Sequence, residues 1–386
     1  AALAQNAGSL LRDRQQELET VLPNPALNLD EPSAEQAPDS AEAGETISVR
    51  SLEFAGKENL LSSEDRTKFK ELLEGKEVGF SAISALSEQA NVTLRQNGYL
   101  LAHTIIPQQD VTNGVLTIEI IEGQLEDIST VFEEGVRIRA GVIQSYVDRW
   151  IDEGGLRKSE LETALLRIGD LPGVTARSRL APGKSTGTSN LVIDVSEEPI
   201  FAGAIFGDNF GSPSTGRAQG HAQLTASDIT GVGDFSRFGF SLSEGQRYAS
   251  VSVSVPITAS GLSATIDYSY LNYENQDALG QAAGLEGHAH YGGISLDYQA
   301  IRARNANLRF TAALDGKALV DDSAAGRLSN KRVISGTLGM TGDVRDNLLG
   351  GSVTQLSLSW THGDLDLSRV PTAELVDSLG LRSQGK

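Results

Sequence analysis

Few side chains in this sequence stand in a pattern that could do chemistry. Gly183-Lys184-Ser185 matches the end of a phosphate-binding loop, in which backbone N–H groups and a lysine hold phosphate. That loop also needs a glycine five residues earlier, where the chain has Ser178, and the surroundings predict a turn between two strands rather than a strand leading into a helix. We therefore expect no nucleotide site.

His288 and His290 are spaced to lie on one face of a strand, where they could share a metal ion. The sequence has five histidines, no cysteine and no acid cluster beside this pair, so a solvated strand end is the better interpretation. Carboxylates are plentiful, but no nucleophile, base and orienting group form a recognisable set. We expect no catalytic residue, no metal site and no cofactor, and therefore no enzyme.

The composition limits which partners the protein could have. The chain has 386 residues and a formal net charge of −19, which argues against a nucleic-acid partner because no basic surface is available to neutralise phosphates. No apolar run reaches the roughly 18 residues that a membrane-spanning helix needs. A β-barrel is then the only structure by which this chain could cross a membrane.

The N-terminal residues are expected to lie outside any packed core. Ala2-Leu3-Ala4 fits the end of a cut secretory signal. Residues 9–22 are strong helix formers with a thin apolar stripe, so this helix is expected to be mostly wet, or to lie in a polar cavity held by polar contacts. Residues 23–46 hold four prolines and six acids without a base, which is typical of a disordered linker.

Two successive stretches predict small α+β modules. In residues 47–123 a strand and two amphipathic helices precede a hairpin, whose apolar, β-branched strands are expected at Tyr99–Ile106 and Val115–Ile121. The order is β-α-α-β-β. Residues 124–198 repeat that order, with a closing hairpin at Val174–Leu180 and Leu191–Val195, so the two modules form an internal repeat.

Residues 199–386 predict strands without helices. Apolar and polar residues alternate strand after strand, as in Leu262–Tyr270, which gives each strand one apolar and one polar face. This is the pattern of a transmembrane barrel with lipid outside and water inside, and we expect about nine strands. Tyr248, Tyr273 and Tyr291 lie near predicted strand ends, where an interfacial aromatic girdle is expected.

The layout resembles a known family. Three stretches carry the resemblance: GYLLAHTIIPQQDVTNGVLTIEIIEGQLEDI, residues 171–195 and residues 208–234. They are similar to the two module hairpins and the first barrel hairpin of two-partner secretion transporters (TpsB proteins of the haemolysin-activator type), within the POTRA-bearing outer-membrane translocators. The family's Val-Arg-Gly-Tyr/Phe motif is absent, so the sequence is expected to be a fragment without the C-terminal barrel strands.

The resemblance implies a fold and a function. It implies a plug helix in residues 1–22, a linker in 23–46, POTRA modules in 47–123 and 124–198, and part of a transmembrane barrel in 199–386. The implied protein lies in the bacterial outer membrane, in contact with its lipid. Its periplasmic POTRA modules catch an unfolded secreted partner, a large β-helical exoprotein, which the barrel passes outward by type V secretion. An insertase that assembles other barrels, and a porin with periplasmic binding modules, stay open as alternatives.

Two sets of residues are expected to contact partners. The first is the strand at the edge of the first module, beside the helix at 82–97, whose unpaired N–H and C=O groups could add an extended client as a further strand. Its residues are Tyr99, Leu100, Leu101, Ala102, His103, Thr104, Ile105 and Ile106. The second set is the polar side of the plug helix, given by Arg12, Arg14 and Glu17.

Overall fold

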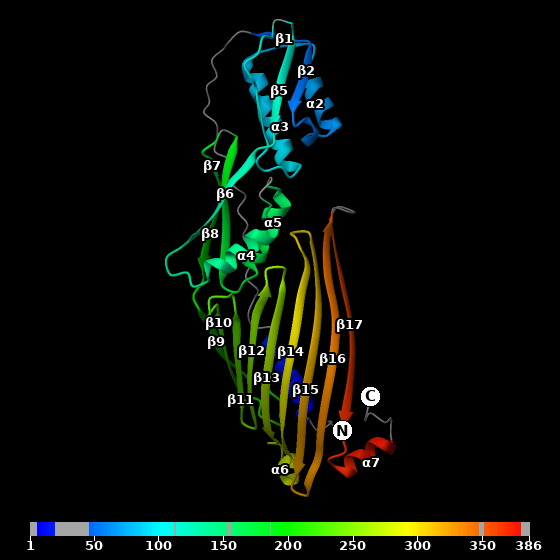
Figure 1. Ribbon diagram of the computed structural model, residues 1–386. Helices are drawn as coiled ribbons and strands as arrows, with labels where there is room; N and C mark the ends of the chain where they lie inside the picture. The colour runs from blue at the N-terminus through cyan, green and yellow to red at the C-terminus, as the bar shows by residue number, and fades with distance from the viewer. Residues whose placement is uncertain are drawn as a thin grey trace.

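The computed structural model describes residues 6–19, 46–111, 113–152, 156–185, 187–346 and 351–379, without the side chains of residues 13 and 16–19. Two small α+β modules lie end to end above a long, curved antiparallel sheet, as Figure 1 shows. Among the described residues, none of the helices combines the length and the apolar character needed to cross a membrane.

The first module, residues 47–123, has two small sheets. Strands β2, β5 and β4 form one sheet in the order β2-β5-β4, with β2 parallel and β4 antiparallel to β5, while β1 and β3 pair separately. The expected strand Tyr99–Ile106 is wrong in extent, because only three of its residues are in β4. The elements are β1 (Ile47–Val49), β2 (Ser51–Gly56), η1 (Glu58–Leu60), α2 (Ser63–Leu73), β3 (Lys76–Val78), α3 (Phe80–Gln96), β4 (His103–Ile105) and β5 (Val115–Ile121).

The second module, residues 124–198, repeats the plan. Its sheet order is β6-β8-β7, with β6 parallel and β7 antiparallel to β8, and two helices pack on it. Ile143 and Ile168 of these helices are fully buried against Leu191 and Ile193 of β8, which anchors the helices to the sheet. The elements are β6 (Gln124–Phe132), α4 (Ala140–Trp150), α5 (Lys158–Gly169), β7 (Val174–Pro182) and β8 (Thr188–Glu197).

The remaining strands form one nine-stranded antiparallel meander, the barrel sheet, with β9 and β17 at its edges. The expectation of about nine strands is confirmed, and with it the fold class of two α+β modules followed by a partial barrel. The expectation of no helices in this region is wrong, because two short helices, Ala278–Ala283 and Pro371–Leu379, lie in it. The elements are β9 (Phe201–Asp208), β10 (Gln219–Ser227), β11 (Phe235–Ser243), β12 (Gln246–Thr258), β13 (Leu262–Glu274), α6 (Ala278–Ala283), β14 (Glu286–Arg302), β15 (Ala306–Ser323), β16 (Gly326–Asp346), β17 (Ser352–Asp366) and α7 (Pro371–Leu379).

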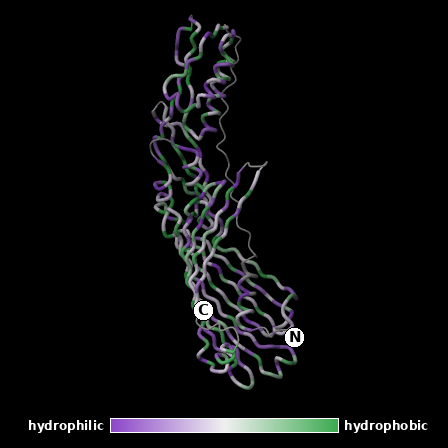
Figure 2. Tube along the Cα trace, turned by 90° about the vertical axis from the view of Figure 1, so that its right-hand side faces the viewer, coloured by the Kyte–Doolittle hydropathy of each residue, from purple (hydrophilic) through white to green (hydrophobic). Residues whose placement is uncertain are grey.

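The two faces of the barrel sheet differ as the alternation predicts. On the outer face the apolar Ile266 is 61% exposed, whereas the inner face of the same strand carries the buried polar Ser269 as well as Leu271, which is fully buried. Figure 2 shows hydrophobic and hydrophilic residues alternating along these strands. The girdle prediction is wrong for Tyr248, Tyr273 and Tyr291, which share the inner face and pack in one cluster there. Their strand-end positions did not reveal this, because the face depends on register rather than on distance from the turn.

Candidate functional site

The sequence that resembles a phosphate-binding loop forms the turn between β7 and β8. The N–H groups of Lys184 and Ser185 donate to Oε2 of Glu126 (2.7 and 3.3 Å), and the Thr188 hydroxyl donates to the same oxygen (2.6 Å). These hydrogen bonds, that of Thr188 foremost, hold the pKa of the Glu126 carboxyl below its ordinary value. A carboxylate of the chain itself therefore takes the place that an anion would need.

The histidine pair lies on the outer face of the barrel sheet among aromatic rings. His290 Nδ1 is 2.9 Å from the Tyr268 hydroxyl, and its ring centroid is 4.9 Å from that of Tyr270 and 5.8 Å from that of His288. Nowhere in the described part of the chain do three or more His, Cys, Asp or Glu residues come together as metal ligands. These rings form an aromatic patch on the outer face.

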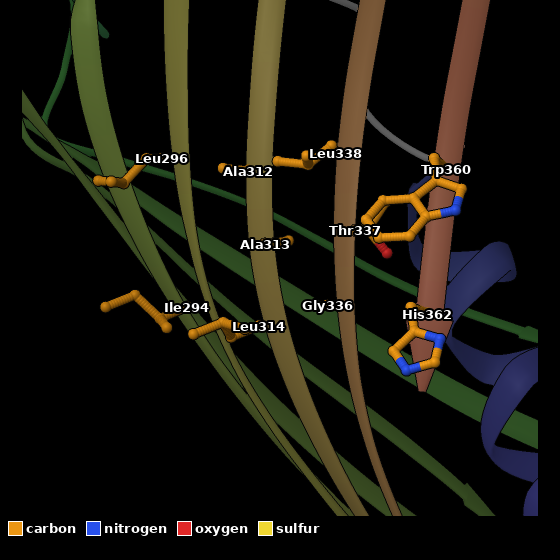
Figure 3. A pocket seen from close by; sticks show the side chains of 10 residues that line it. All are labelled: Ile294, Leu296, Ala312, Ala313, Leu314, Gly336, Thr337, Leu338, Trp360 and His362. Carbon is orange, nitrogen blue, oxygen red and sulfur yellow. The ribbon is translucent and has the colours of Figure 1, made fainter. Parts of the chain in front are cut away.

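The outer face also carries a shallow apolar hollow over β14–β17. Its volume is about 510 Å³, and Ile294, Leu314, Leu338 and Trp360 stand around it, as Figure 3 shows. Small residues form its floor, since Gly336 adds no side chain between the leucines. An apolar hollow on an apolar face suits contact with lipid chains rather than with a polar ligand.

The predicted edge-strand residues of the first module have three different locations. Tyr99 forms an isolated bridge with Arg157 of the second module. Leu101 is only 8% exposed and belongs to the apolar core of the second module, against which Leu100 also packs. This part of the predicted strand therefore joins the two modules and does not offer an edge.

The other predicted edge residues stay within the first module. Ala102 is buried in its core and Ile106 packs against that core, so neither presents a free edge. His103, Thr104 and Ile105 form β4, which does lie at the edge of the sheet. The expected edge position is thus confirmed for three of the eight residues.

The open side of β4 is already occupied by α3. His103 and Ile105 pair with β5, so Thr104 alone turns its N–H outward. That N–H donates to Oδ1 of Asn91 (2.7 Å), and the Thr104 hydroxyl donates to the Ser87 carbonyl (3.0 Å). Asn91 and Ser87 are residues of α3, so the helix fills the groove that a client strand would need.

Beyond β4, a side chain protects the next part of the sheet edge. Nε2 of Gln109 donates to the Thr117 carbonyl and Oε1 accepts from the Thr117 N–H, each over 2.7 Å. The amide thereby completes on β5 the two hydrogen bonds that an additional strand would make. Native sheets commonly protect an exposed edge in this way.

The edge strand of the second module, β7, is longer and more open. Backbone bonds join Gly183 N–H to the Thr188 carbonyl and Glu198 N–H to the Gly173 carbonyl, which fixes the alternation along the β7–β8 ladder. By that alternation, the N–H and C=O groups of Ala176, Ser178 and Leu180 face away from β8. The sequence predicted a client surface on the first module only. In the second module, β7 lies at the sheet edge that corresponds to that of β4 in the first.

The N-terminal helix α1 (Ala7–Glu19) lies against the inner face of the barrel sheet, behind β14 and β15 in Figure 1. It does so through apolar contacts as well as polar ones, so the expectation of polar contacts alone is wrong. The helix residues Ala7, Leu10 and Leu11 are buried in a cluster with residues of three strands. The strand residues are Tyr248, Leu271, Tyr273 and Ala289.

The polar contacts of α1 lie at its start and middle. The Ala7 N–H donates to Oδ1 of Asp321 (3.0 Å), which also accepts from the Tyr273 hydroxyl (2.7 Å). Arg14 is buried and donates to Oε1 of Gln246 (3.3 Å), whereas Arg12 is exposed. The Glu17 side chain and the linker at residues 20–45 lie outside the described residues.

Comparison with known proteins places these observations in a family. Residues 47–123 match the ShlB-type POTRA domain, and residues 187–363 match the haemolysin secretion/activation protein ShlB/FhaC/HecB. These two matches cover separate parts of the chain and carry its similarity to POTRA-bearing transporters. The two-partner secretion resemblance expected from the sequence is therefore confirmed.

Curated relatives of the family are themselves named transporters. The heme/hemopexin transporter protein HuxB of Haemophilus influenzae (strain 86-028NP) is 28% identical over 299 residues, covering 75% of this chain and 51% of HuxB. The outer membrane transporter CdiB of Dickeya dadantii is 26% identical over 203 residues, covering 52% of this chain and 35% of that protein. This chain spans about half the length of HuxB. The names agree with the expected outer-membrane location of the family.

Solved structures of the family share the fold. CdiB from Escherichia coli superposes with a TM-score of 0.59 at 20% identity, covering 94% of this chain and 68% of that one. CdiB from Acinetobacter baumannii gives a TM-score of 0.53 at 16% identity, covering 92% and 69%. The chain thus shares the fold of these two structures.

Proposed function

We propose that this chain forms the periplasmic modules and the N-terminal part of the barrel of an outer-membrane transporter that exports an unfolded secreted partner. The observation that carries the proposal is the division of the barrel sheet into an apolar outer face and an inner face covered by α1. One face suits outer-membrane lipid, and the other suits a pore that a polar helix can close.

The two modules supply the client-binding surface of this proposal. The outward N–H and C=O groups of Ala176, Ser178 and Leu180 can pair with an extended client strand, which gives affinity without demanding one client sequence. The first-module surface predicted at Tyr99–Ile106 can contribute through β4 only if Asn91 releases Thr104. We therefore propose β7 as the first place of capture.

The client is proposed to be an unfolded, large β-helical exoprotein, as the family resemblance implies. A chain held as an added strand is kept extended, and the client's own folding outside the cell supplies the direction of transport. No nucleic acid and no cofactor enter this scheme, because the modules recognise backbone and the net charge of −19 repels phosphates.

Helix α1 is proposed to be the resting plug, with the buried Arg14 rather than the exposed Arg12 as a polar contact. Burying Leu10 and Leu11 adds roughly 1.5–3 kcal/mol each relative to exposure, so the plug is held more firmly than ion pairs alone would hold it. The release of α1 from the lumen must therefore be coupled to client binding or to another favourable step.

The test uses the intact transporter in outer membranes and in planar bilayers. Deleting residues 1–22 is expected to raise ion conductance while secretion of the co-expressed partner continues. Deleting residues 47–198 is expected to abolish secretion and leave an ion-conducting barrel. Secretion that persists without the modules would contradict the proposal. Solute flux without any secretion by the intact protein would indicate a porin. Failure of other barrel proteins to assemble would instead indicate an insertase.

A further inference from the structure

Arg167 of the second module makes contacts outside that module. It lies in the last turn of α5 and is only 3% exposed, yet its guanidinium reaches out of the module to the barrel sheet. Nη1 donates to the Ser260 carbonyl (3.0 Å) and Nη2 donates to the Gln299 carbonyl (2.9 Å). One side chain thus bridges the β12–β13 turn and β14.

Trp150 at the end of α4 completes this contact. The Arg167 guanidinium carbon lies 4.3 Å from the centroid of the Trp150 rings, in the stacked arrangement of a cation–π pair. The indole N–H of Trp150 donates to the Ala259 carbonyl (2.9 Å). Two helices of the second module therefore hold the same barrel turn, each by a side-chain donor.

The turn is shaped to receive the guanidinium. Gly261 has φ +100°, a conformation that favours glycine, and a β-carbon there would collide with Nη1 of Arg167. A larger residue in the turn would therefore displace the guanidinium. The glycine and the arginine form one fitted contact, although they are 94 positions apart in the sequence.

Ion pairs and hydrogen bonds extend the contact to the neighbouring turns. Asp170 accepts two hydrogen bonds from Arg302, each 2.8 Å long, just beyond the end of α5. On the other side, Arg139 Nη2 donates to the Thr230 carbonyl (2.9 Å) and Arg137 Nε to the Asp228 carbonyl (3.2 Å). The second module thus grips three successive periplasmic turns of the barrel sheet, with Arg167 at the middle one.

The joint between the two modules is built differently. Its backbone contacts are the Tyr99–Arg157 bridge and the hydrogen bond from Lys158 N–H to the Gly98 carbonyl (2.9 Å). Beside them the apolar side chain of Leu101 is inserted into the second module's core. Apolar contacts tolerate small rotations, whereas a buried forked donor with two fixed carbonyl partners does not.

We propose that Arg167 is a positioning residue that fixes the second module on the barrel, so that edge strand β7 keeps one orientation toward the lumen. The inference rests on the proposed function, because it gives β7 the task of passing a client strand to the pore. A lysine cannot replace Arg167, since a single ammonium lacks the planar fork that reaches both carbonyls.

Removing the guanidinium leaves the Ser260 and Gln299 carbonyls without their donor. Each hydrogen bond from a charged group contributes about a factor of ten or more to an equilibrium. Arg167→Ala is therefore expected to lower the ratio of docked to undocked second module by at least about tenfold. Arg167→Lys is expected to have an intermediate effect, because it keeps the charge without the fork.

This sequence contains no cysteine, so a pair of introduced cysteines gives the only labelling sites within it. Spin labels at Gln144→Cys on α4 and Asn305→Cys in the β14–β15 turn report the distance between the module and the barrel in the intact transporter. Both positions are exposed. A narrow distance distribution is expected in the parent and a broad one in Arg167→Ala. Partial broadening is expected in Arg167→Lys and in Trp150→Phe, which loses the indole donor and keeps a smaller aromatic ring.

Two controls separate positioning from a general loss of structure. Arg149→Ala removes an exposed cation that also lies over Trp150 (5.2 Å) but has no described hydrogen bond to the barrel, and it should keep the distribution narrow. A second label pair, Ala85→Cys with Gln144→Cys, spans the two modules and should not respond to Arg167→Ala. Broadening there as well would mean that the module has lost its fold, and Arg167→Lys and Trp150→Phe would then decide.

Secretion measured on the same variants completes the test. Secretion is expected to fall with the fraction of protein whose second module is docked on the barrel, while the conductance of the barrel is retained. A narrow Gln144–Asn305 distribution in both Arg167→Ala and Arg167→Lys would overturn it, whatever happens to secretion. Broadening without any loss of secretion would overturn the functional part. If the parent protein exports no partner, the proposed function fails, and the distance measurement still decides whether Arg167 positions the module.

Discussion

The two modules share one plan but treat their equivalent edges in opposite ways. In the first module the edge strand β4 has three residues, and its outward N–H, that of Thr104, is held by Asn91. In the second module β7 has nine residues, and the outward groups from Ala176 to Leu180 lie along an open edge. Among the described residues, no group would have to be displaced for a further extended strand to add to the second sheet.

The difference indicates that the first and second modules have different roles. The first module uses the segment after α3 to reach into its neighbour through Leu101, so this part of its chain serves the joint. The second module has its edge free and its helices fixed to the barrel through Trp150 and Arg167. Under the proposed function, the open edge of β7 is thus held beside the barrel sheet, and the first module extends the protein away from it.

The largest expected effect comes from removing the side chain that joins the modules. Leu101→Ala should lower the free energy of unfolding of the second module by about 2–4 kcal/mol, because a buried leucine of one module fills the core of the other. Chemical denaturation of the segment 46–198 can be followed by the fluorescence of Trp150, its only tryptophan. Ile105→Ala, a change at the partly exposed β4 surface, is the control. Equal effects of the two would show that Leu101 does not stabilise the neighbouring module.

The next effect compares proline at the two edges. Ser178→Pro removes an N–H that faces the open side of β7, where proline is tolerated without breaking the ladder to β8. It should reduce client capture about tenfold, as expected when one or two hydrogen bonds are lost from an added strand. Thr104→Pro should reduce capture by less than about twofold, since that N–H already has a partner. Binding of the purified partner to both variants measures the ratio, and a larger loss at Thr104 would reverse our assignment of the capture edge.

Much of this arrangement could be predicted from the sequence, and the reason lies in periodicity. The β-α-α-β-β order of the modules and the strands of the barrel sheet follow from local hydrophobic patterns, which fix the type of each element. A short apolar run is ambiguous, however: the run from Tyr99 to Ile106 predicts one strand, although its first three residues contact the other module. A pattern reports that a residue is buried and does not report which core buries it.

Contacts between distant residues could not be predicted at all. The fitted pair of Arg167 and Gly261 and the closure of β4 by Asn91 depend on how elements meet in space. The contacts of α1 with the tyrosines of the barrel sheet depend on strand register in the same way. Glu126, the carboxylate partner of the Gly183–Ser185 turn, is also distant in sequence. The sequence could therefore predict that this turn is not a phosphate-binding loop, but not which group it binds.

A smaller effect is expected from opening the closed edge. Asn91→Ala frees the Thr104 N–H by removing its hydrogen bond to the Asn91 side chain, which should cost the first module about 1–2 kcal/mol. In a Ser178→Pro background the same change should recover part of the lost client binding, about twofold to threefold, because β4 then offers an outward donor. Gln89→Ala, on the exposed side of α3, serves as the control. No recovery in the double variant would mean that β4 is not a latent client edge.

The smallest effect concerns the turn that ends β7 and is a pH dependence. Hydrogen bonds from Thr188, Ser185 and Lys184 lower the pKa of the Glu126 carboxyl in the folded protein, so the ionised form stabilises the turn. That contribution is fully present above the ordinary pKa of 4.5 and is lost as the pH falls through the lower folded value. Amide-exchange protection of Lys184 N–H should fall over that range.

In Glu126→Gln the protection of the Lys184 N–H should already be low at neutral pH and should change little on acidification, because the neutral amide carries no charge to lose. The corresponding change at Glu134, an exposed carboxylate of the same module, should leave the acid-dependent loss intact. If Glu126→Gln and the parent lost protection in parallel, the carboxylate would not anchor the turn. The end of β7 would then be fixed only by its hydrogen bonds to β8. In that case neither edge strand would depend on pH, because the partners of β4 are neutral.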